Sequence, residues 1–224
     1  MSRFTPQLGW LVTRHIQELN IYAQVFHNRI VNAFDDLITE ADQIEKEEYS
    51  RLSTISSGDS GDDSDECERA YFKGVDFYIA TDAVRQGTFN LMVAGLFHLF
   101  EQQAGALARE LDRKGELSSS EYPWAKLQEI LRHKKVDVRL FKSHLLLDEL
   151  RLAANVIKHG DGKSSNELRS RNPDLFEEIN LPFAGVLLPL RPLVGEGLRL
   201  TVHHFKNYHA CLEGFYQELT ESLS

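Results

Sequence analysis

The chain has 224 residues, of which 42% are hydrophobic and 26% are charged, and it carries a formal net charge of -9. This composition is that of an ordinary globular protein with one well-packed domain, or at most two small ones. The acidic balance argues against a protein that coats nucleic acid non-specifically, because such binding depends on lysine and arginine neutralising phosphates. It leaves room for a small, local basic site.

Cysteine usage and hydropathy indicate the compartment. Cys67 and Cys211 are the two cysteines, too few for a disulfide framework, so we expect free thiols in a reducing environment. The longest nearly apolar run, residues 91–100, contains His98 and is too short to cross a bilayer. The opening segment has no basic stretch followed by an apolar run. We therefore expect a cytoplasmic protein with no membrane partner.

Two long helices are predicted in the N-terminal half. Thr5 and Pro6 form a helix start, and apolar residues then recur at threes and fours, which predicts one long amphipathic helix to about Glu48. A second long helical segment is predicted over residues 68–113, with Gly87 as a candidate bend and a buried second half. Between them, the serine-rich and acidic residues 53–66 predict a solvated, mobile loop without the ligand alternation of a calcium-binding EF-hand.

The C-terminal half predicts shorter elements. Helices are expected over residues 123–132, from near Val138 to His159, over residues 164–171, and from Thr201 to the end. Three prolines in residues 181–202 indicate two extended pieces, residues 184–190 and 198–200, that pair as a small hairpin. The predicted fold class is mainly all-α, an up-and-down bundle with two long N-terminal helices and a small β-hairpin or extended segment near residues 184–200. We expect a single domain over residues 1–224, with the acidic loop at about 53–66.

The helix ending at His159 carries the strongest candidate site. Five polar residues recur at spacings of four, three, four and four, which places them on one helix face: His144, Asp148, Arg151, Asn155 and His159. The opposite face carries an apolar stripe for packing, namely Leu146, Leu150, Ala153 and Ile157. Gly160 is the expected helix stop. The alternative is a solvated face on which Asp148 simply pairs with Arg151.

Other candidate sites are weaker. Gly162, Lys163 and Ser164 look like the tail of a phosphate-binding P-loop, but Ile157 stands where its first glycine belongs and a helix precedes it, so only a local phosphate contact is retained. The histidines at 203, 204 and 209 are poorly spaced for zinc. Neither a G-x-S-x-G turn nor a convincing nucleophilic cysteine is present. Glu101 is expected to meet the polar stripe if the two helices are neighbours.

The segment LRLAANVIKHGDG, following a helical hairpin with LFHLFEQQ, resembles the HEPN superfamily over about half of the chain. Those all-α bundles carry an arginine four to six residues before a histidine, and an asparagine often follows the arginine directly. Asn155 and His159 match the asparagine and histidine positions, and Lys158 is a common neighbour. The arginine position holds Ala154. Arg151, on the same stripe but eight residues before His159, is the candidate substitute.

The resemblance implies a function and its residues. Many members are metal-independent ribonucleases of toxin–antitoxin and antiphage systems that act as dimers, whereas others bind nucleotides or partners without catalysis. The expected function is therefore an endoribonuclease or effector of a bacterial defence system; the alternative is a catalytically inactive module that binds a nucleotide or a partner protein. His159 would transfer protons, Arg151 would stabilise phosphate charge and Asn155 would orient the phosphate or the imidazole. The remaining implied features are a homodimer, RNA as substrate, an antitoxin or defence-complex protein as partner, no cofactor or metal, and substrate contacts from Lys158, Lys163, His144, Asp148 and Glu101.

Overall fold

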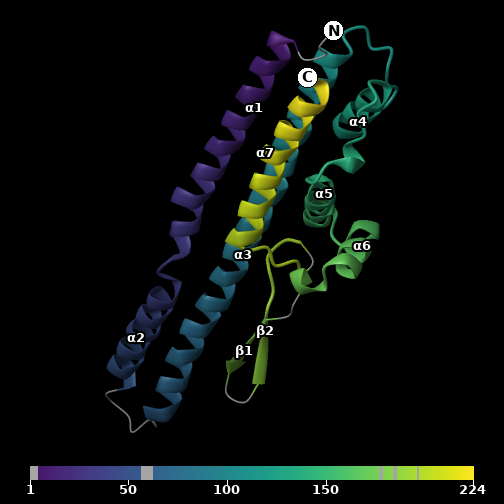
Figure 1. Cartoon of the computed structure of the whole chain (residues 1–224). Helices are drawn as coiled ribbons and strands as arrows, with labels where there is room; N and C mark the ends of the chain where they lie inside the picture. The colour runs from purple at the N-terminus through teal and green to yellow at the C-terminus, as the bar shows by residue number, and fades with distance from the viewer. Residues whose placement is uncertain (1–4, 57–62, 177–178, 184–185, 196) are drawn as a thin grey trace.

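The computed structural model describes residues 5–56, 63–176, 179–183, 186–195 and 197–224. Within these residues the chain forms seven α-helices, four short η segments and one two-stranded sheet (Figure 1). The prediction of a mainly all-α bundle with long N-terminal helices is confirmed. Among the described helices, none combines the length and the apolar composition needed to span a lipid bilayer.

The first predicted helix is interrupted. Helix α1 (Pro6–Val25) begins as expected, with the Thr5 hydroxyl accepting the N–H of Leu8 at 3.2 Å. A π-helical turn (Phe26–Val31) and a 3-10 turn (Asn32–Phe34) then separate it from α2 (Leu37–Ser56). The prediction of one continuous helix to Glu48 is therefore wrong. The π-helical turn begins at Phe26, whose buried ring stacks on Phe205 with 4.0 Å between ring centroids.

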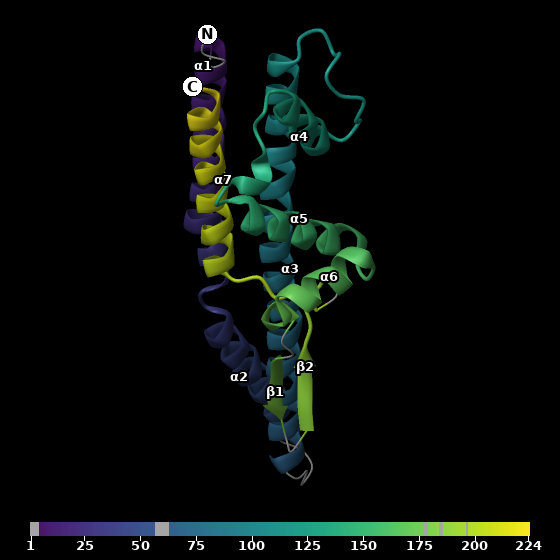
Figure 2. The ribbon, with the colours of Figure 1, turned by 45° about the vertical axis from the view of Figure 1, so that its right-hand side comes forward.

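Helix α3 (Asp63–Leu111) runs the whole length of the molecule (Figure 2). Because α2 continues to Ser56 and α3 begins at Asp63, residues 53–56 and 63–66 are helical and the loop prediction is wrong for them; its centre, residues 57–62, lies outside the described residues. The helix also passes through Gly87 without a break. A Cβ at this glycine would lie 2.9 Å from the Cβ of Leu193, so the residue permits a close approach instead of a bend.

The C-terminal half of α3, the upper half in Figure 1, forms the centre of the bundle. Helices α1 and α7 (Val202–Leu223) lie antiparallel along one side, and α4 (Pro123–His133) and α5 (His144–His159) lie on the other (Figures 1 and 2). The 3-10 turn η3 (Val138–Leu140) connects α4 to α5, which crosses α3 at a steep angle. The core between them is rich in buried aromatic residues, with Phe100, Phe205, Phe215 and Tyr216 among its largest members. Below it, α2 and the first half of α3 form a two-helix arm.

The β-hairpin differs from the prediction. Strand β1 (Ile179–Phe183) pairs antiparallel with β2 (Val186–Leu190), so the predicted pairing of residues 184–190 with 198–200 is wrong. The backbone of residues 198–200 is instead bonded by the side chain of Asn90 on α3, which donates to the Leu198 carbonyl at 2.7 Å and accepts the N–H of Leu200 at 3.3 Å. Helix α6 (Lys163–Arg171) and the 3-10 turn η4 (Pro173–Phe176) precede the hairpin, and Thr201 caps α7 as predicted.

Candidate functional site

Helix α5 presents one polar edge to solvent because most of its circumference is covered. Leu150, Ala153 and Ile157 are buried as predicted, and Leu146 is partly buried. The predicted apolar stripe was too narrow, however, since four further residues are also buried: Leu147, Leu152, Ala154 and Val156. This follows from the position of α5 between α3, α6 and α7, whose contacts the residue spacing of one helix does not reveal.

The end of α5 meets the beginning of α6 at a short glycine-containing corner. Gly160 has a positive φ of 69° and its N–H bonds to the Val156 carbonyl at 2.8 Å, which confirms the predicted helix stop. Gly162 then stands at the N-cap of α6, and a glycine has no side chain with which to cap the first-turn amides. Such amides, at the positive end of the helix dipole, favour a bound anion.

A small open cavity of about 290 Å³ lies at this corner, and we call it the corner cavity. Asn155 and His159 from α5 and Lys163 from α6 line it together with the connecting residues Gly160, Asp161, Gly162 and Ser164. Within the described part of the chain, the side chains of Asn155, His159 and Lys163 make no hydrogen bond or ion pair. The cavity thus combines an amide, an imidazole and an ammonium group that are all available to a bound molecule.

Arg151 does not line the corner cavity. Its Nε donates to Oδ1 of Asp148 at 2.7 Å, and the other carboxylate oxygen of Asp148 accepts from Nη1 of Arg171 at 2.7 Å. Arg171 also pairs with Glu167 on its own helix. Burial raises the pKa of Asp148, but the hydrogen bonds from the two arginines outweigh it and hold that pKa below its ordinary value. On this stretch of the edge Asp148 pairs with Arg151, as the solvated-face alternative expects, and also with Arg171 of α6.

The other predicted residues fall in different places. Glu101 on α3 does meet α5, but through Lys158, whose Nζ lies 4.0 Å from its Oε2. His144 begins α5, fifteen residues before His159 and so about 22 Å away along the helix. The structure therefore gathers Asn155, His159 and Lys163, and leaves His144 apart from them.

Ala154 stands where the resemblance noted above expects an arginine, and the structure shows the surroundings of this position. Ala154 is fully buried against the core, so a longer side chain at this position would enter apolar surroundings instead of the corner cavity. Arg151 occupies the outer edge together with Asn155 and His159. In this chain, therefore, the buried side of α5 carries Ala154, and the arginine lies on the outer side at position 151.

Comparison with known proteins gives no family to this site. Neither protein-family models, nor curated proteins, nor solved structures match the chain. Arg171 and Gly162 were not among the predicted site residues. Gly162 lies within the loop for which the sequence predicts a phosphate contact, whereas nothing in the residue spacing places Arg171 beside Asp148.

The C-terminal histidines have local partners. His204 Nδ1 accepts the N–H of Thr201 at 3.0 Å and completes the capping box at the start of α7. His203 Nε2 lies 3.0 Å from Nδ2 of Asn207. Nδ1 of His209 lies 3.8 Å from a carboxylate oxygen of Glu213. These contacts assign the histidines to the surface and packing of α7.

Proposed function

We propose that this protein is a metal-independent endoribonuclease of the HEPN type, acting in the cytoplasm as part of a bacterial toxin–antitoxin or antiphage system. One observation carries the proposal: Asn155, His159 and Lys163 line the same open cavity with their polar groups unoccupied. The resemblance of the segment around Asn155 and His159 to the HEPN motif supplies the reaction class.

The chemistry follows from the groups at the corner cavity. In RNA cleavage by transesterification, the 2′-oxygen attacks the phosphorus, the bond from phosphorus to the 5′-oxygen breaks, and a cyclic phosphate and a 5′-hydroxyl result. His159 would take the proton from the 2′-hydroxyl or give one to the leaving oxygen. Lys163 and the first-turn amides of α6 would stabilise the charge on the phosphate, and Asn155 would orient it.

A second copy of the chain would complete the site. One imidazole cannot act as base and acid at the same moment, because the two protons move on opposite sides of the phosphorus. A symmetric dimer that faces two corner cavities towards one another would provide a second His159. Two Lys163 side chains would then lie beside one RNA strand. Their positive charge would reduce the repulsion between the acidic chain and the RNA phosphates.

The test is cleavage of a fluorescent single-stranded RNA in the presence of EDTA. Wild-type protein should cut it, and His159→Ala should lower the rate by about a hundredfold or more, the usual size of an acid–base contribution. The matched control is His203→Ala, an exposed histidine on α7, which should cut at the wild-type rate. An RNA that wild-type protein leaves intact across pH 5 to 8 would refute the proposal.

The second candidate is a catalytically inactive module that binds a nucleotide phosphate, or a partner protein, at the same corner. The ion pair of Arg151 with Asp148 favours this candidate. Among the described residues, Arg151 carries the only guanidinium of the predicted polar stripe, and the ion pair holds it outside the corner cavity. In that case wild-type protein would leave RNA uncut, yet nucleoside monophosphates would raise its melting temperature. Lys163→Gln should abolish that rise.

A further inference from the structure

Negative charge is concentrated in one part of the molecule. Residues 35–76, which contain α2 and the first turns of α3, hold 14 acidic and 4 basic residues, a formal charge of -10. The rest of the chain holds 20 acidic and 21 basic residues, a formal charge of +1. The acidity of the whole sequence therefore belongs to the two-helix arm, and the remainder is close to neutral. An arm of this charge attracts a cationic partner.

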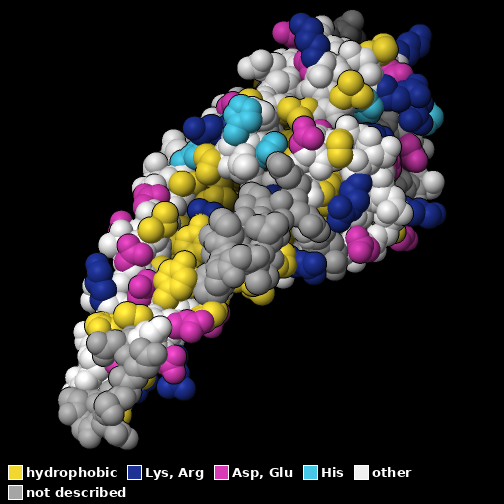
Figure 3. Space-filling model, turned by 90° about the horizontal axis from the view of Figure 1, so that it is seen from below, with side chains coloured by type: hydrophobic (Ala, Val, Ile, Leu, Met, Phe, Trp, Pro, Cys, Tyr) yellow, Lys and Arg dark blue, Asp and Glu magenta, His cyan; other side chains and the backbone are white. Residues whose placement is uncertain are grey.

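The arm carries an open groove of about 640 Å³ between α2 and α3, which we call the arm groove. Ile44 of α2 and Phe77 of α3, both partly buried, form its apolar lining. Asp36, Glu40 and Glu47 place three carboxylates in the same lining, and none of the three forms an ion pair among the described residues. Hydrophobic and acidic side chains lie next to one another along the arm (Figure 3). Such a groove is complementary to a cationic segment that exposes an apolar side chain.

A surface of this kind lies on the same chain, in the connection between α4 and α5. Residues 132–142, which we call the basic turn, hold five basic residues and one acidic residue, a formal charge of +4. The acidic residue, Asp137, is already paired with an arginine of the same turn. Arg132, Lys135 and Lys142 are exposed, and within the described part of the chain they form no ion pair. These three cations are therefore available to an acidic partner.

The basic turn also exposes an apolar side chain. Leu140 is 82% exposed, the largest fraction among the exposed large hydrophobic residues that the structure describes. Leu145, in the first turns of α5, is 76% exposed. A phosphate backbone offers polar and charged contacts and no apolar surface for such side chains, whereas the centre of a protein interface does offer it. The basic turn is therefore better suited to an acidic protein surface than to a nucleic acid.

Lys135 occupies a backbone conformation that glycine usually adopts. It follows the C-cap of α4 with a φ of 63°, and its N–H bonds to the Arg132 carbonyl at 2.9 Å. Glycine enters this left-handed region freely at helix ends, whereas a lysine there carries a steric cost. The helix dipole favours a cation at this end, but Arg132 and His133 in the last turn already supply one. The cost at Lys135 therefore indicates a role for its side chain.

The arm groove and the basic turn match one another in charge and in apolar character. We propose that the basic turn of one copy of this chain docks into the arm groove of a second copy, with Leu140 against Ile44 and Phe77 and the cations of the turn beside the carboxylates of the groove. The arm projects beyond the bundle, away from α4 and α5 of its own chain, so a second copy can reach it (Figure 1).

The proposed contact is of the head-to-tail kind, because it joins two different surfaces. Such a contact repeats from copy to copy unless the copies close into a ring. It is distinct from the symmetric dimer that would face two corner cavities towards one another. Neither the arm groove nor the basic turn lines the corner cavity, so the inference goes beyond the proposed function and stands or falls without it.

The test is self-association of the whole chain, measured by sedimentation velocity over a range of protein concentrations at low and at high salt. Wild type should associate, and salt should weaken the association because it screens the charges of both surfaces. Leu140→Ser should weaken it about tenfold or more, the effect of withdrawing one leucine from an apolar contact. The matched control is Leu193→Ser, an exposed leucine outside both surfaces, which should associate as wild type does.

Charge variants test the two surfaces separately. Glu40→Lys in the arm groove should weaken the association, whereas Glu121→Lys, the same change at an exposed position before α4, should not. Lys135→Gly should also weaken it, while its melting temperature stays at or above that of wild type because glycine relieves the backbone. A loss of association in a variant that is at least as stable as wild type excludes unfolding as the cause.

A mixing experiment identifies the head-to-tail arrangement. Leu140→Ser keeps an intact arm groove and Glu40→Lys keeps an intact basic turn, so a mixture of the two variants should form a one-to-one complex with wild-type affinity and stop there. Absence of that complex would overturn the inference, because it would mean that like surfaces meet.

Three other results would also overturn it. The first is a wild-type protein that stays monomeric at every concentration in low salt. The second is an association that Glu40→Lys leaves unchanged, because the contact would then lie outside the arm groove. The third is a Lys135→Gly variant that associates as wild type does but loses affinity for a single-stranded RNA with 2′-O-methyl groups, which would make the basic turn an RNA contact.

Discussion

At the scale of single residues, a buried histidine gives the protein a built-in dependence on pH. His15 is only 4% exposed, and its ring lies 5.8 Å from that of Tyr216. Burial lowers the pKa of His15 from 6.5 to about 4; Glu18 opposes this shift and Arg14 adds to it. The Nδ1 atom has no hydrogen-bond partner within the described residues. The folded protein therefore holds this imidazole neutral at physiological pH.

We expect stability to fall as the pH drops from about 6.5 towards 4, because the unfolded chain then binds a proton that the folded chain excludes. The loss from this one group should approach about 3 kcal/mol at the lower end and be absent above pH 6.5. His15→Leu should remove that part of the dependence, as measured by urea unfolding at a series of pH values. Leu19→Met, one turn further along the same buried face, should keep the wild-type slope. Equal slopes for His15→Leu and wild type would contradict the assignment.

Two helical glycines should respond to alanine in opposite directions. A Cβ at Gly95 on α3 would lie 2.2 Å from the hydroxyl of Tyr22, which donates to the Met92 carbonyl at 2.9 Å. Gly95→Ala must therefore displace Tyr22, at a cost of about 1–3 kcal/mol. Gly214 on α7 has no atom of the described residues within 4 Å of its Cβ position, so Gly214→Ala should stabilise by about 0.5–1 kcal/mol. Thermal unfolding of both variants tests the contrast, and a destabilised Gly214→Ala or a neutral Gly95→Ala would contradict it.

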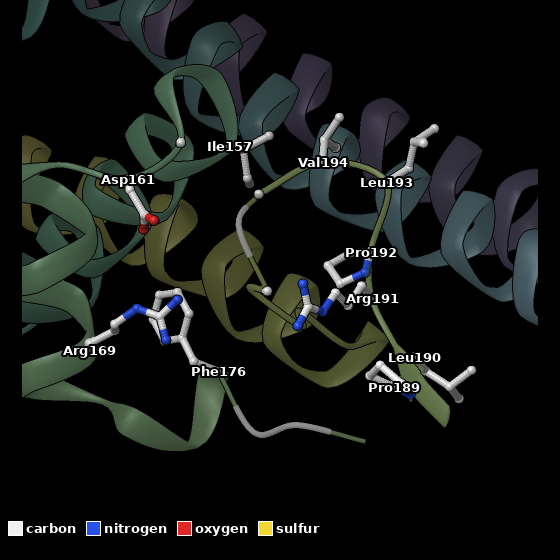
Figure 4. A pocket seen from close by; sticks show the side chains of 13 residues that line it. Ile157, Asp161, Arg169, Phe176, Pro189, Leu190, Arg191, Pro192, Leu193 and Val194 are labelled. Carbon is white, nitrogen blue, oxygen red and sulfur yellow. The ribbon is translucent and has the colours of Figure 1, made fainter. Parts of the chain in front are cut away.

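At the scale of elements, α3 fixes the segment after the hairpin with side chains at a spacing of four. Asp82 pairs with Arg199 at 3.3 Å, Gln86 donates to the Leu200 carbonyl at 2.8 Å, and Asn90 donates to the Val194 carbonyl at 2.9 Å. The bonds from Gln86 and Asn90 satisfy backbone carbonyls of a segment that runs beside α3 (Figure 4) and pairs with no strand among the described residues.

Asn90→Ala should cost about 3 kcal/mol, because buried carbonyls of two residues lose their donor at once. Hydrogen exchange of residues 193–200 should become faster in the same variant, while that of α7 residues beyond Phe205 changes little. Gln102→Ala, an exposed position on α3, serves as the control and should leave both measurements unchanged. If Asn90→Ala kept wild-type stability, the contacts to α3 would not be what holds the segment.

Elements whose ends are encoded locally could be predicted from the sequence. Thr5 and Thr201 cap their helices with their own hydroxyls, and Gly160 ends α5 because its backbone needs a positive φ. The break after α1 could not be predicted, since neither proline nor glycine marks it and the ring that Phe26 contacts there, Phe205, comes from the far end of the chain. The hairpin was misplaced for a similar reason: the contacts of residues 198–200 come from Asn90, more than a hundred residues earlier.

In the candidate site too, contacts between residues close in the sequence could be predicted, and contacts between distant segments could not. Asn155 and His159 lie four residues apart on one helix, so their spacing alone placed them together, and Lys163 followed from the glycines beside it. The pairing of Arg151 with Asp148 is local and was the stated alternative. Arg171, which also bonds Asp148, comes from the next helix, α6. Such contacts between elements cannot be predicted from residue spacing, because they depend on how the elements pack in the fold.

At the scale of the whole molecule, one long helix passes through two different environments. The upper half of α3 is enclosed by α1, α4, α5 and α7, and most of its residues between 93 and 108 are buried. In the arm, α3 packs mainly against α2, and hydrophobic side chains remain exposed along it, among them Ile38, Tyr71 and Phe72 (Figure 3). Apolar burial, the main source of stability, is therefore concentrated at one end.

Hydrogen exchange along α3 should reveal this gradient. Backbone amides of residues 68–80 should exchange at least about tenfold faster than those of residues 93–107, because opening the arm exposes little buried apolar surface whereas opening the bundle exposes the aromatic core. The comparison lies within one continuous helix, so it needs no correction for differences between elements. Val93→Ala should accelerate exchange in the bundle and leave the arm unchanged. Uniform protection along α3 would mean that the arm gains cohesion from contacts beyond those between α2 and α3, and the two-environment description would then be wrong.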